Sequence, residues 1–372
     1  MFGLHKLFAD RKEVTPMGKK EKDQRLLRRN LLGVCVFLLA LPVLWPMGGA
    51  AFAMREILPG QVSAAEPTGE EGADTTGERE TTEEPAKETG LFGIDDLKFK
   101  EEEQVAAAYL PREEVERMQD FSYLQKTYYT TDSRTMLLPT DINVNDALAK
   151  DFTIDTDVDG PQVLIFHTHI SEGFADSDMS KGKEEGIWGA GEYLKELLEE
   201  KYGIEVLHHD GVYDQVNGKG QVTGAYERME PPIRQILEEN PSIQVCIDIH
   251  RDGVPEGTHL VTEVNGKPTA KIMFFNGLCR LNQNGQAVPT PGLDNPYVSD
   301  NLAFSLQMQT QSAARFPDFN RKIYLNAYRF SLHMLPRSTL IEVGAQTNTK
   351  EEVHNAMEPL AEILAAVLLG GE

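Results

Sequence analysis

The fold expected for this chain is decided by residues 161–172, which read P-Q-V-L-I-F-H-T-H-I-S-E. The apolar run from Val163 to Phe166 follows a glycine and a proline, and it is typical of a short strand buried on both faces of a parallel sheet. His167, His169 and Glu172 come directly after this run. Because ligands of open α/β sheets bind beyond the carboxyl ends of the strands, we expect a functional site at these residues.

Two imidazoles and one carboxylate at a strand end supply the nitrogen and oxygen ligands that Zn²⁺ prefers. The spacings H-x-H and H-x-x-E also occur by chance, and the alternative is a strand end that carries solvated histidines. The choice between these two interpretations depends on the other strands of the chain.

Short apolar runs alternate with amphipathic segments after residue 161, which is the pattern of βαβ units. We therefore expect an α/β domain over residues 161–372, with a mainly parallel sheet flanked by helices. An N-terminal arm over residues 101–160 precedes it. The expected strands are 163–166, 204–207, 243–249 and 338–343, and the expected helices are 186–202, 228–240, 298–315 and 351–369.

Local signals fix several ends of these elements. Gly203 is expected to stop the first helix, and Pro231 and Pro232 are expected in the first turn of the second helix. Asn265-Gly266 lies between two strand-like runs and predicts a β-hairpin.

The chain before residue 101 has a different character. Residues 1–30 are polar and basic, and residues 31–53 are almost wholly apolar, about 23 residues that can span a bilayer. The basic flank predicts a single-pass anchor in the cell membrane, with a cytoplasmic N-terminus and an extracytoplasmic domain. The motif Ala51-Phe52-Ala53 also fits a cleaved signal peptide, which is the alternative. Residues 54–100 are rich in Glu, Thr, Gly, Pro and Ala and predict a disordered acidic tether.

Composition excludes some classes of function. The formal net charge of −23 argues against a nucleic-acid partner. The three cysteines, Cys35, Cys246 and Cys279, have no paired spacing, so neither a disulfide scaffold nor a thiolate metal site is indicated.

Two further strands carry groups for metal binding or proton transfer. His250 follows the strand 243–249, and we predict His169, Glu172 and His250 as the Zn²⁺ ligands, because three protein ligands leave an open position for water. Glu342 lies in the apolar strand I-E-V, where a lone buried carboxylate is costly. We predict Glu342 as the general base of a hydrolase.

Alternatives remain for these residues and their neighbours. Glu342 could form an ion pair with Arg251 or Arg329. Asp248 lies two residues before His250 and therefore on the same side of its strand, where it could orient the imidazole or instead pair with Arg251.

Four further histidines are assigned from the same pattern. His167 is a candidate outer residue of the site, or the first ligand in place of His169. His208, His209 and His333 are expected to be solvated or hydrogen-bonded rather than ligands.

Four ordered motifs carry a resemblance to a known family: L-I-F-H-T-H-I-S-E, C-I-D-I-H-R-D-G, K-I-M-F-F-N-G and S-T-L-I-E-V-G-A-Q-T-N-T. From about Tyr123 to Leu369 the chain resembles the stage II sporulation protein P family of cell-wall hydrolases. More distantly it resembles zinc N-acetylmuramoyl-L-alanine amidases.

The resemblance implies a function in sporulation. It implies hydrolysis of peptidoglycan between N-acetylmuramic acid and L-alanine during engulfment of the forespore, and an endopeptidase activity on peptide cross-links is also attributed to the family. It also implies a membrane-bound partner and a partner that cleaves glycan.

Two rival functions share parts of this pattern. A zinc carboxypeptidase also uses H-x-x-E, a later His and a later Glu, and it needs a cation for the terminal carboxylate of its substrate. The candidates for that cation are Arg251, Arg315, Arg321 and Arg329. The second rival is a non-catalytic scaffold that binds the cell wall and would tolerate loss of zinc and of Glu342.

Overall fold

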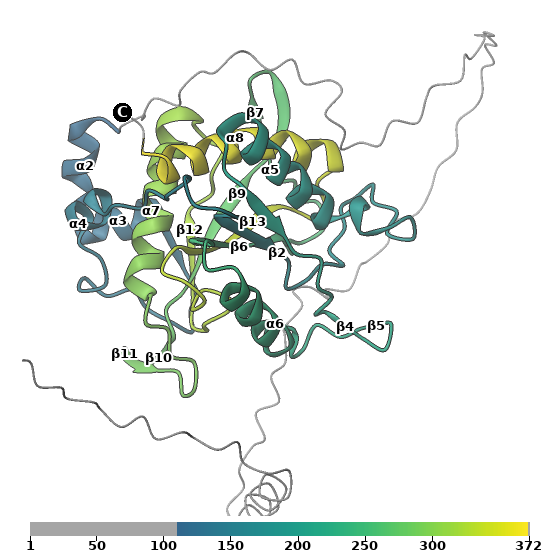
Figure 1. The fold of residues 1–372 in the computed structure, drawn as a ribbon. Coiled ribbons are helices and arrows are strands. Elements are labelled where there is room, and N and C mark those ends of the chain that lie inside the picture. Colours follow the sequence, from purple (N-terminus) through teal and green to yellow (C-terminus); the bar gives the residue numbers. More distant parts are fainter. Residues whose placement is uncertain (1–109, 371–372) are drawn as a thin grey trace, which may run out of the picture. The chain divides into compact units, whose positions relative to one another are not determined.

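The computed structural model describes residues 110–370, which form the domain shown in Figure 1. The predicted cytoplasmic arm, membrane anchor and acidic tether, as well as residues 101–109 of the N-terminal arm, lie outside the described residues. Within residues 110–370, no helix combines the length and the apolar character needed to cross a membrane.

A seven-stranded sheet forms the centre of the domain, in the order β1-β12-β9-β13-β6-β2-β3. Strands β13, β6, β2 and β3 are parallel to one another, and so are β1, β12 and β9. The two groups meet in the antiparallel pair β9–β13, so the predicted, mainly parallel sheet is confirmed. The bounds are β1 (Tyr129–Thr131), β12 (Ile323–Asn326), β9 (Ile272–Gly277), β13 (Ser338–Ala345), β6 (Val245–Asp252), β2 (Val163–Phe166) and β3 (Val206–His208).

Helices cover the two faces of this sheet unequally (Figure 1). Three long helices, α5 (Ile187–Tyr202), α7 (Val298–Arg315) and α8 (Lys350–Leu368), pack on one face, and α6 (Ala225–Glu239) packs on the other. Short helices of the N-terminal arm lie beside α7 at the β1 edge: α2 (Arg112–Met118), α3 (Phe121–Tyr128) and α4 (Val144–Ala149).

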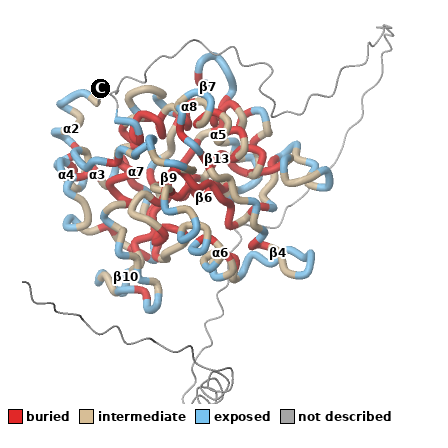
Figure 2. Tube along the Cα trace, viewed as in Figure 1, coloured by how far each residue is buried: buried red, intermediate tan, exposed pale blue. Residues whose placement is uncertain are grey.

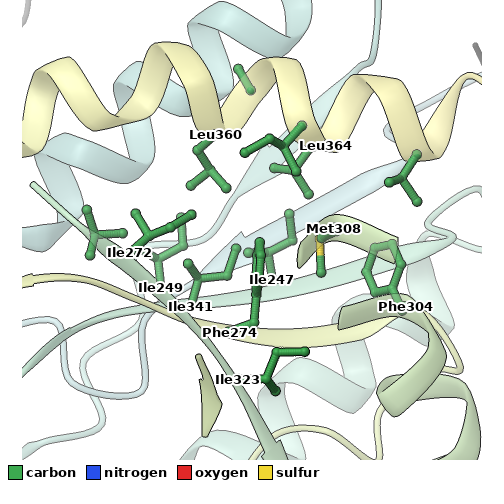
Figure 3. Close-up of a cluster of buried hydrophobic side chains, with 14 of the residues drawn as sticks. Ile247, Ile249, Ile272, Phe274, Phe304, Met308, Ile323, Ile341, Leu360 and Leu364 are labelled. Atoms are coloured by element: carbon green, nitrogen blue, oxygen red, sulfur yellow. The ribbon is translucent and has the colours of Figure 1, made fainter. Parts of the chain in front are cut away.

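The main core fills the layer between the sheet and its three long helices. Figure 3 shows Ile247 and Ile249 of β6 with Leu360 and Leu364 of α8, and all four side chains are fully buried. Strands β6 and β13 run through the most deeply buried part of the domain (Figure 2). Burial of this apolar surface is the main stabilising contribution to the fold.

The alternation of side chains along β6 decides where the polar residues go. Ile247 and Ile249 face the main core, so Cys246, Asp248 and His250 face the side covered by α6. If the strand were turned over, so that the other set of side chains faced the main core, Asp248 and His250 would be buried among apolar side chains. A site is therefore built on the α6 side, at the carboxyl ends of the central parallel strands.

Several predicted elements are confirmed. The strand 163–166 and the helix 298–315 have the predicted bounds, and Gly203 ends α5 in the left-handed conformation with φ 66°. Asn265 and Gly266, with φ of 51° and 77°, turn the predicted hairpin between β7 (Val261–Val264) and β8 (Lys267–Ala270).

Other predicted bounds were wrong. Pro231 and Pro232 lie inside α6 rather than in its first turn, because the helix begins earlier, after the left-handed Gly224. The second of the two runs that flank Asn265-Gly266, residues 269–275, was expected as one strand, but it divides into the end of β8 and a separate strand, β9, of the main sheet.

The two strands that carry the site are longer than predicted. Strand β6 continues to Asp252 and β13 to Ala345, because their mutual pairing persists past a register shift. His250 therefore lies within a strand and not after it.

Some elements were not predicted. They are β1, β12 and two short strand pairs: β10 (Arg280–Gln283) with β11 (Gln286–Pro289), and β4 (Gln215–Val216) with β5 (Lys219–Gly220).

Candidate metal centre

The three predicted ligands converge at the carboxyl ends of β2 and β6. His169 and Glu172 come from the loop after β2, and His250 comes from β6. One ligand atom of each lies within 4.8 Å of the others. The Nδ1 atoms of His169 and His250 lie 3.6 Å from Oε1 and Oε2 of Glu172, respectively.

These distances fit a metal shell better than a hydrogen-bonded cluster. A distance of 3.6 Å is too long for a hydrogen bond, but it is close to the ligand–ligand edge of about 3.3 Å that Zn²⁺ bonds of about 2.0–2.1 Å give in a tetrahedron. The donor set of two nitrogens and one carboxylate therefore fits Zn²⁺.

Backbone and side-chain contacts hold Glu172 in place. The backbone N–H of Arg251 donates to Oε2 of Glu172 over 2.9 Å. Burial by itself raises the pKa of Glu172, but His169 and His250 together outweigh this and hold the pKa well below its usual range. The carboxyl group is thus ionised and available to a cation.

Asp248 orients His250. Its Oδ1 lies 2.8 Å from Nε2 of His250, and the carboxylate also accepts hydrogen bonds from N–H and Oγ1–H of Thr168, over 2.9 and 2.7 Å. Burial by itself lowers the pKa of His250, yet Asp248 and Glu172 raise it well above its usual value. To bind a metal, His250 would release the proton on Nδ1, which lies toward Glu172, while Asp248 remains beside Nε2 and sets the orientation of the ring.

Within the described residues the guanidinium group of Arg251 forms no salt bridge with Asp248, so the alternative in which these two residues pair was wrong. It donates instead to the backbone carbonyls of Gly173 and Asp252, over 2.6 and 3.2 Å. Arg251 thereby ties the loop after β2 to the end of β6.

Glu342 lies beside the cluster on β13, in register with His250 of β6. Its Oε2 is buried and has no hydrogen-bond partner among the described residues. Burial raises the pKa of Glu342 to about 8, Glu172 and Asp252 add to this effect, and His250 and Arg321 oppose it. Such a carboxyl group can both accept and donate a proton near neutral pH.

The ion pairs considered for Glu342 are not formed. Arg329 binds Glu230 over 2.7 Å, and Arg251 binds the two carbonyls described above. Within residues 110–370 we find no salt bridge to Glu342, so this alternative was wrong.

His167 is on the opposite side of the sheet from the ligand cluster. Its Nδ1 lies 2.8 Å from the carbonyl oxygen of Ile249, and its Nε2 lies 2.8 Å from Nε2 of His208. Burial, more than any other cause, lowers its pKa to about 3. The structure thus brings His169 rather than His167 to the cluster. Strand β2 ends at Phe166 and the chain turns at Thr168 and His169, so the alternation of an extended strand, which would place His167 and His169 on one face, no longer applies.

The remaining histidines lie outside the cluster, as expected. His209 contacts Tyr213 over 2.6 Å, and His333 lies 3.1 Å from Glu230. His208 touches the site only through His167.

Two residues near the centre were missed from the sequence. Thr168 holds Asp248, and the ring of Tyr226 lies 5.7 Å from that of His169, measured between centroids. The position of Thr168 between His167 and His169, the two histidines singled out from the sequence, could have marked it as a residue of the site. Nothing local marks Tyr226, which α6 brings from a distant part of the chain.

Comparison with known proteins identifies the family. The profile of the stage II sporulation protein P (SpoIIP) family matches residues 61–365. The chain belongs to this family. A SpoIIP relative, stage II sporulation protein P of Bacillus subtilis (strain 168), is 21% identical over 241 residues. The match covers 61% of this chain and 56% of the relative, so it spans about half of that protein's length.

Solved structures of amidases are also similar to this SpoIIP chain. The N-acetylmuramoyl-L-alanine amidase AmiC2 of Nostoc punctiforme is 13% identical, with 56% of this chain and 96% of that chain covered and a TM-score of 0.32. The CwlD amidase from Clostridioides difficile, in complex with the GerS lipoprotein, is 16% identical, with 55% and 95% covered and a TM-score of 0.32.

Proposed function

We propose that this chain is a zinc-dependent peptidoglycan hydrolase that cleaves the amide between N-acetylmuramic acid and L-alanine during sporulation. The observation that carries the proposal is the cluster of His169, Glu172 and His250 with Glu342 beside it, in a chain of the SpoIIP family. Each of these residues has a role in amide hydrolysis.

Zn²⁺ bound by the three ligands would polarise the scissile carbonyl and make water more acidic. Glu342 accepts the proton of the attacking water as its oxygen bonds to the carbonyl carbon. It then donates this proton to the nitrogen of L-alanine as the carbon–nitrogen bond breaks. The products are a carboxylate on the muramic acid side chain and a free amino group on L-alanine.

The arginines favour the amidase over the carboxypeptidase alternative. That alternative needs a cation free to bind a terminal carboxylate. Each of the four candidates already has a partner in the described residues: Arg251 with Gly173, Arg315 with Glu362, Arg321 with Asp252 and Arg329 with Glu230.

Digestion of purified peptidoglycan by the full-length chain, followed by mass spectrometry, tests the reaction. We expect stem peptides with a free L-alanine amino group, and we expect a chelator to abolish them. Stem peptides shortened at the carboxyl end would support the carboxypeptidase instead, and cleaved cross-links would reveal an endopeptidase. No product with any wall preparation would support the scaffold.

Location and partners belong to the same proposal. The length of the apolar segment 31–53 and its basic flank support a membrane anchor with the domain outside. The family resemblance supports a glycan-cleaving partner and a membrane-bound partner.

A further inference from the structure

The two strands that carry the ligands separate just before the metal centre. The register of β2 with β6 ends at the pair Phe166 and Asp248, whereas His169 lies three residues beyond Phe166 and His250 two residues beyond Asp248. Backbone pairing therefore does not set the distance between the two ligand-bearing segments. Side chains must do so.

In addition to the contacts of Glu172 and Arg251 described above, two side-chain bridges cross the gap ahead of the ligands, one on each face of the sheet. On the α6 side, Asp248 accepts the two hydrogen bonds of Thr168. On the α5 side, the imidazole of His167 reaches the carbonyl oxygen of Ile249 over 2.8 Å. Ile249 directly precedes His250, so the second bridge acts on the backbone of a ligand.

A chain of hydrogen bonds continues from His167 to the surface. Its Nε2 lies 2.8 Å from Nε2 of His208 in β3, and Nδ1 of His208 lies 2.7 Å from Oε2 of Glu192 in α5. The ring of Trp188 stacks on His208 with the centroids 4.7 Å apart, which fixes the plane of that imidazole. None of these three outer residues touches a ligand of the metal centre.

The proton positions along this chain follow from its two ends. A carbonyl oxygen only accepts, so Nδ1 of His167 carries a proton and its Nε2 accepts. Nε2 of His208 must then donate, and one further proton is shared between Nδ1 of His208 and Glu192. By sharing this proton with Nδ1 of His208, Glu192 leaves Nε2 of His208 to donate to His167, and His167 in turn donates to the carbonyl oxygen of Ile249.

A glycine of α5, Gly191, leaves room for the contact between His167 and His208. A Cβ atom at Gly191 would lie 2.7 Å from Nε2 of His167 and 2.9 Å from Nε2 of His208. Both distances are shorter than carbon–nitrogen contacts allow, so any side chain here would force the two imidazoles apart. Gly191 is therefore required for close packing.

We propose that Glu192, His208 and His167 form a positioning device that fixes the distance between His169 and His250 by bridging the separated ends of β2 and β6. The proposal rests on the metal centre described above and extends it to residues of α5 and β3. It assigns no contact with substrate or metal to the three residues.

Zinc affinity of the full-length chain, purified without metal and measured by competition with a chelating dye, tests the device. The side chain of Glu192 is 34% exposed, so its replacement should not prevent folding. We expect Glu192→Ala to weaken zinc binding about tenfold or more, as loss of a group outside the ligand shell commonly does. Glu192→Gln should bind zinc like the parent, because its amide N–H can donate to Nδ1 of His208.

Two further variants complete the test. Gly191→Ala should weaken zinc binding to a similar extent, although both histidines remain. Glu196→Ala is the matched control, because Glu196 lies one turn further along α5 and its buried Oε2 has no hydrogen-bond partner in the part of the chain that the structure describes. It should leave zinc affinity unchanged, and the metal-free unfolding midpoint of each variant shows whether a difference in affinity reflects loss of fold.

The outcomes separate this proposal from the proposed function. Parental zinc affinity in folded Glu192→Ala, or equal weakening in Glu192→Gln and Glu192→Ala, overturns the positioning device alone. Zinc binding by the parent that survives His169→Ala overturns the metal centre and the device together.

Discussion

Glu342 and His250 face each other in register on two adjacent parallel strands, β13 and β6. In parallel strands, residues in register point to the same face of the sheet, so the carboxyl group lies beside the imidazole on the α6 side. Both residues belong to strands of the central sheet and not to loops. The proposed base and one proposed ligand are therefore held at a fixed separation, as catalysis requires.

Glu342→Gln should give a folded, zinc-loaded and inactive protein. Loss of a positioned acid/base group lowers the rate by about 10²–10⁴-fold, while the ligands remain in place. Turnover on purified peptidoglycan, zinc content and the thermal midpoint are measured together. A destabilised variant with near-parental turnover per folded molecule would disprove the general-base role.

The raised pKa of Glu342 also predicts a pH effect on the metal-free protein. Between the ordinary value of 4.5 and about 8, folded Glu342 keeps a proton that the unfolded chain has released. Protonated Glu342 therefore contributes its full stabilisation below pH 4.5, and this stabilisation is lost as the pH rises through about 8. The unfolding midpoint of the parent should therefore fall relative to that of Glu342→Gln over this window.

Zinc supplies the control for that pH experiment. A bound cation lowers the pKa of a neighbouring carboxyl group, so saturating zinc should remove the difference in pH dependence. If the unfolding midpoints of the metal-free parent and of metal-free Glu342→Gln changed with pH in the same way, the raised pKa of Glu342 would be contradicted.

His169→Ala and His250→Ala should each abolish zinc retention with little loss of secondary structure. Each removes one of the three ligands at the carboxyl ends of β2 and β6, and neither imidazole belongs to the apolar clusters of the core. Metal analysis after gel filtration measures retention, and His209→Ala is a control histidine that contacts Tyr213 instead of the cluster. Full zinc content in both variants would show that the ligands were assigned wrongly.

Asp248→Asn should weaken zinc binding about 10–100-fold, which is typical for a group that orients a ligand histidine. The amide N–H would face Nε2 of His250 and favour the tautomer whose proton sits on Nδ1, the proposed ligand atom. A chelator titration measures the affinity. An affinity equal to that of the parent would mean that Asp248 does not select the tautomer.

The proposed membrane topology predicts the result of protease treatment. If residues 31–53 anchor the chain, protease added to cells without a wall should cut between the anchor and the domain and release the domain. Immunoblotting of the supernatant detects the released part. Complete protection in intact cells, with digestion after lysis, would reverse the topology.

The sequence was sufficient where the signal is local. An apolar run of the right length at 163–166 predicted β2, and the polar residues after it predicted the place of the site. His169, Glu172 and His250 could be grouped because parallel strands bring their carboxyl ends to one edge, whatever the order of the strands. The acidic residue in β13 could be singled out because an unpaired carboxyl group in an apolar strand is costly.

The tertiary structure decided what depends on pairing between distant segments. The order of the strands, with β13 next to β6, placed Glu342 opposite His250, and no local property of either strand specifies its neighbour. The same pairing extended β6 past His250. The separate pairing of β2 with β3 brought His208 beside His167, which contacts that imidazole instead of the ligands. Strand order and register depend on contacts summed over the whole core, so residues far apart in the chain determine them jointly.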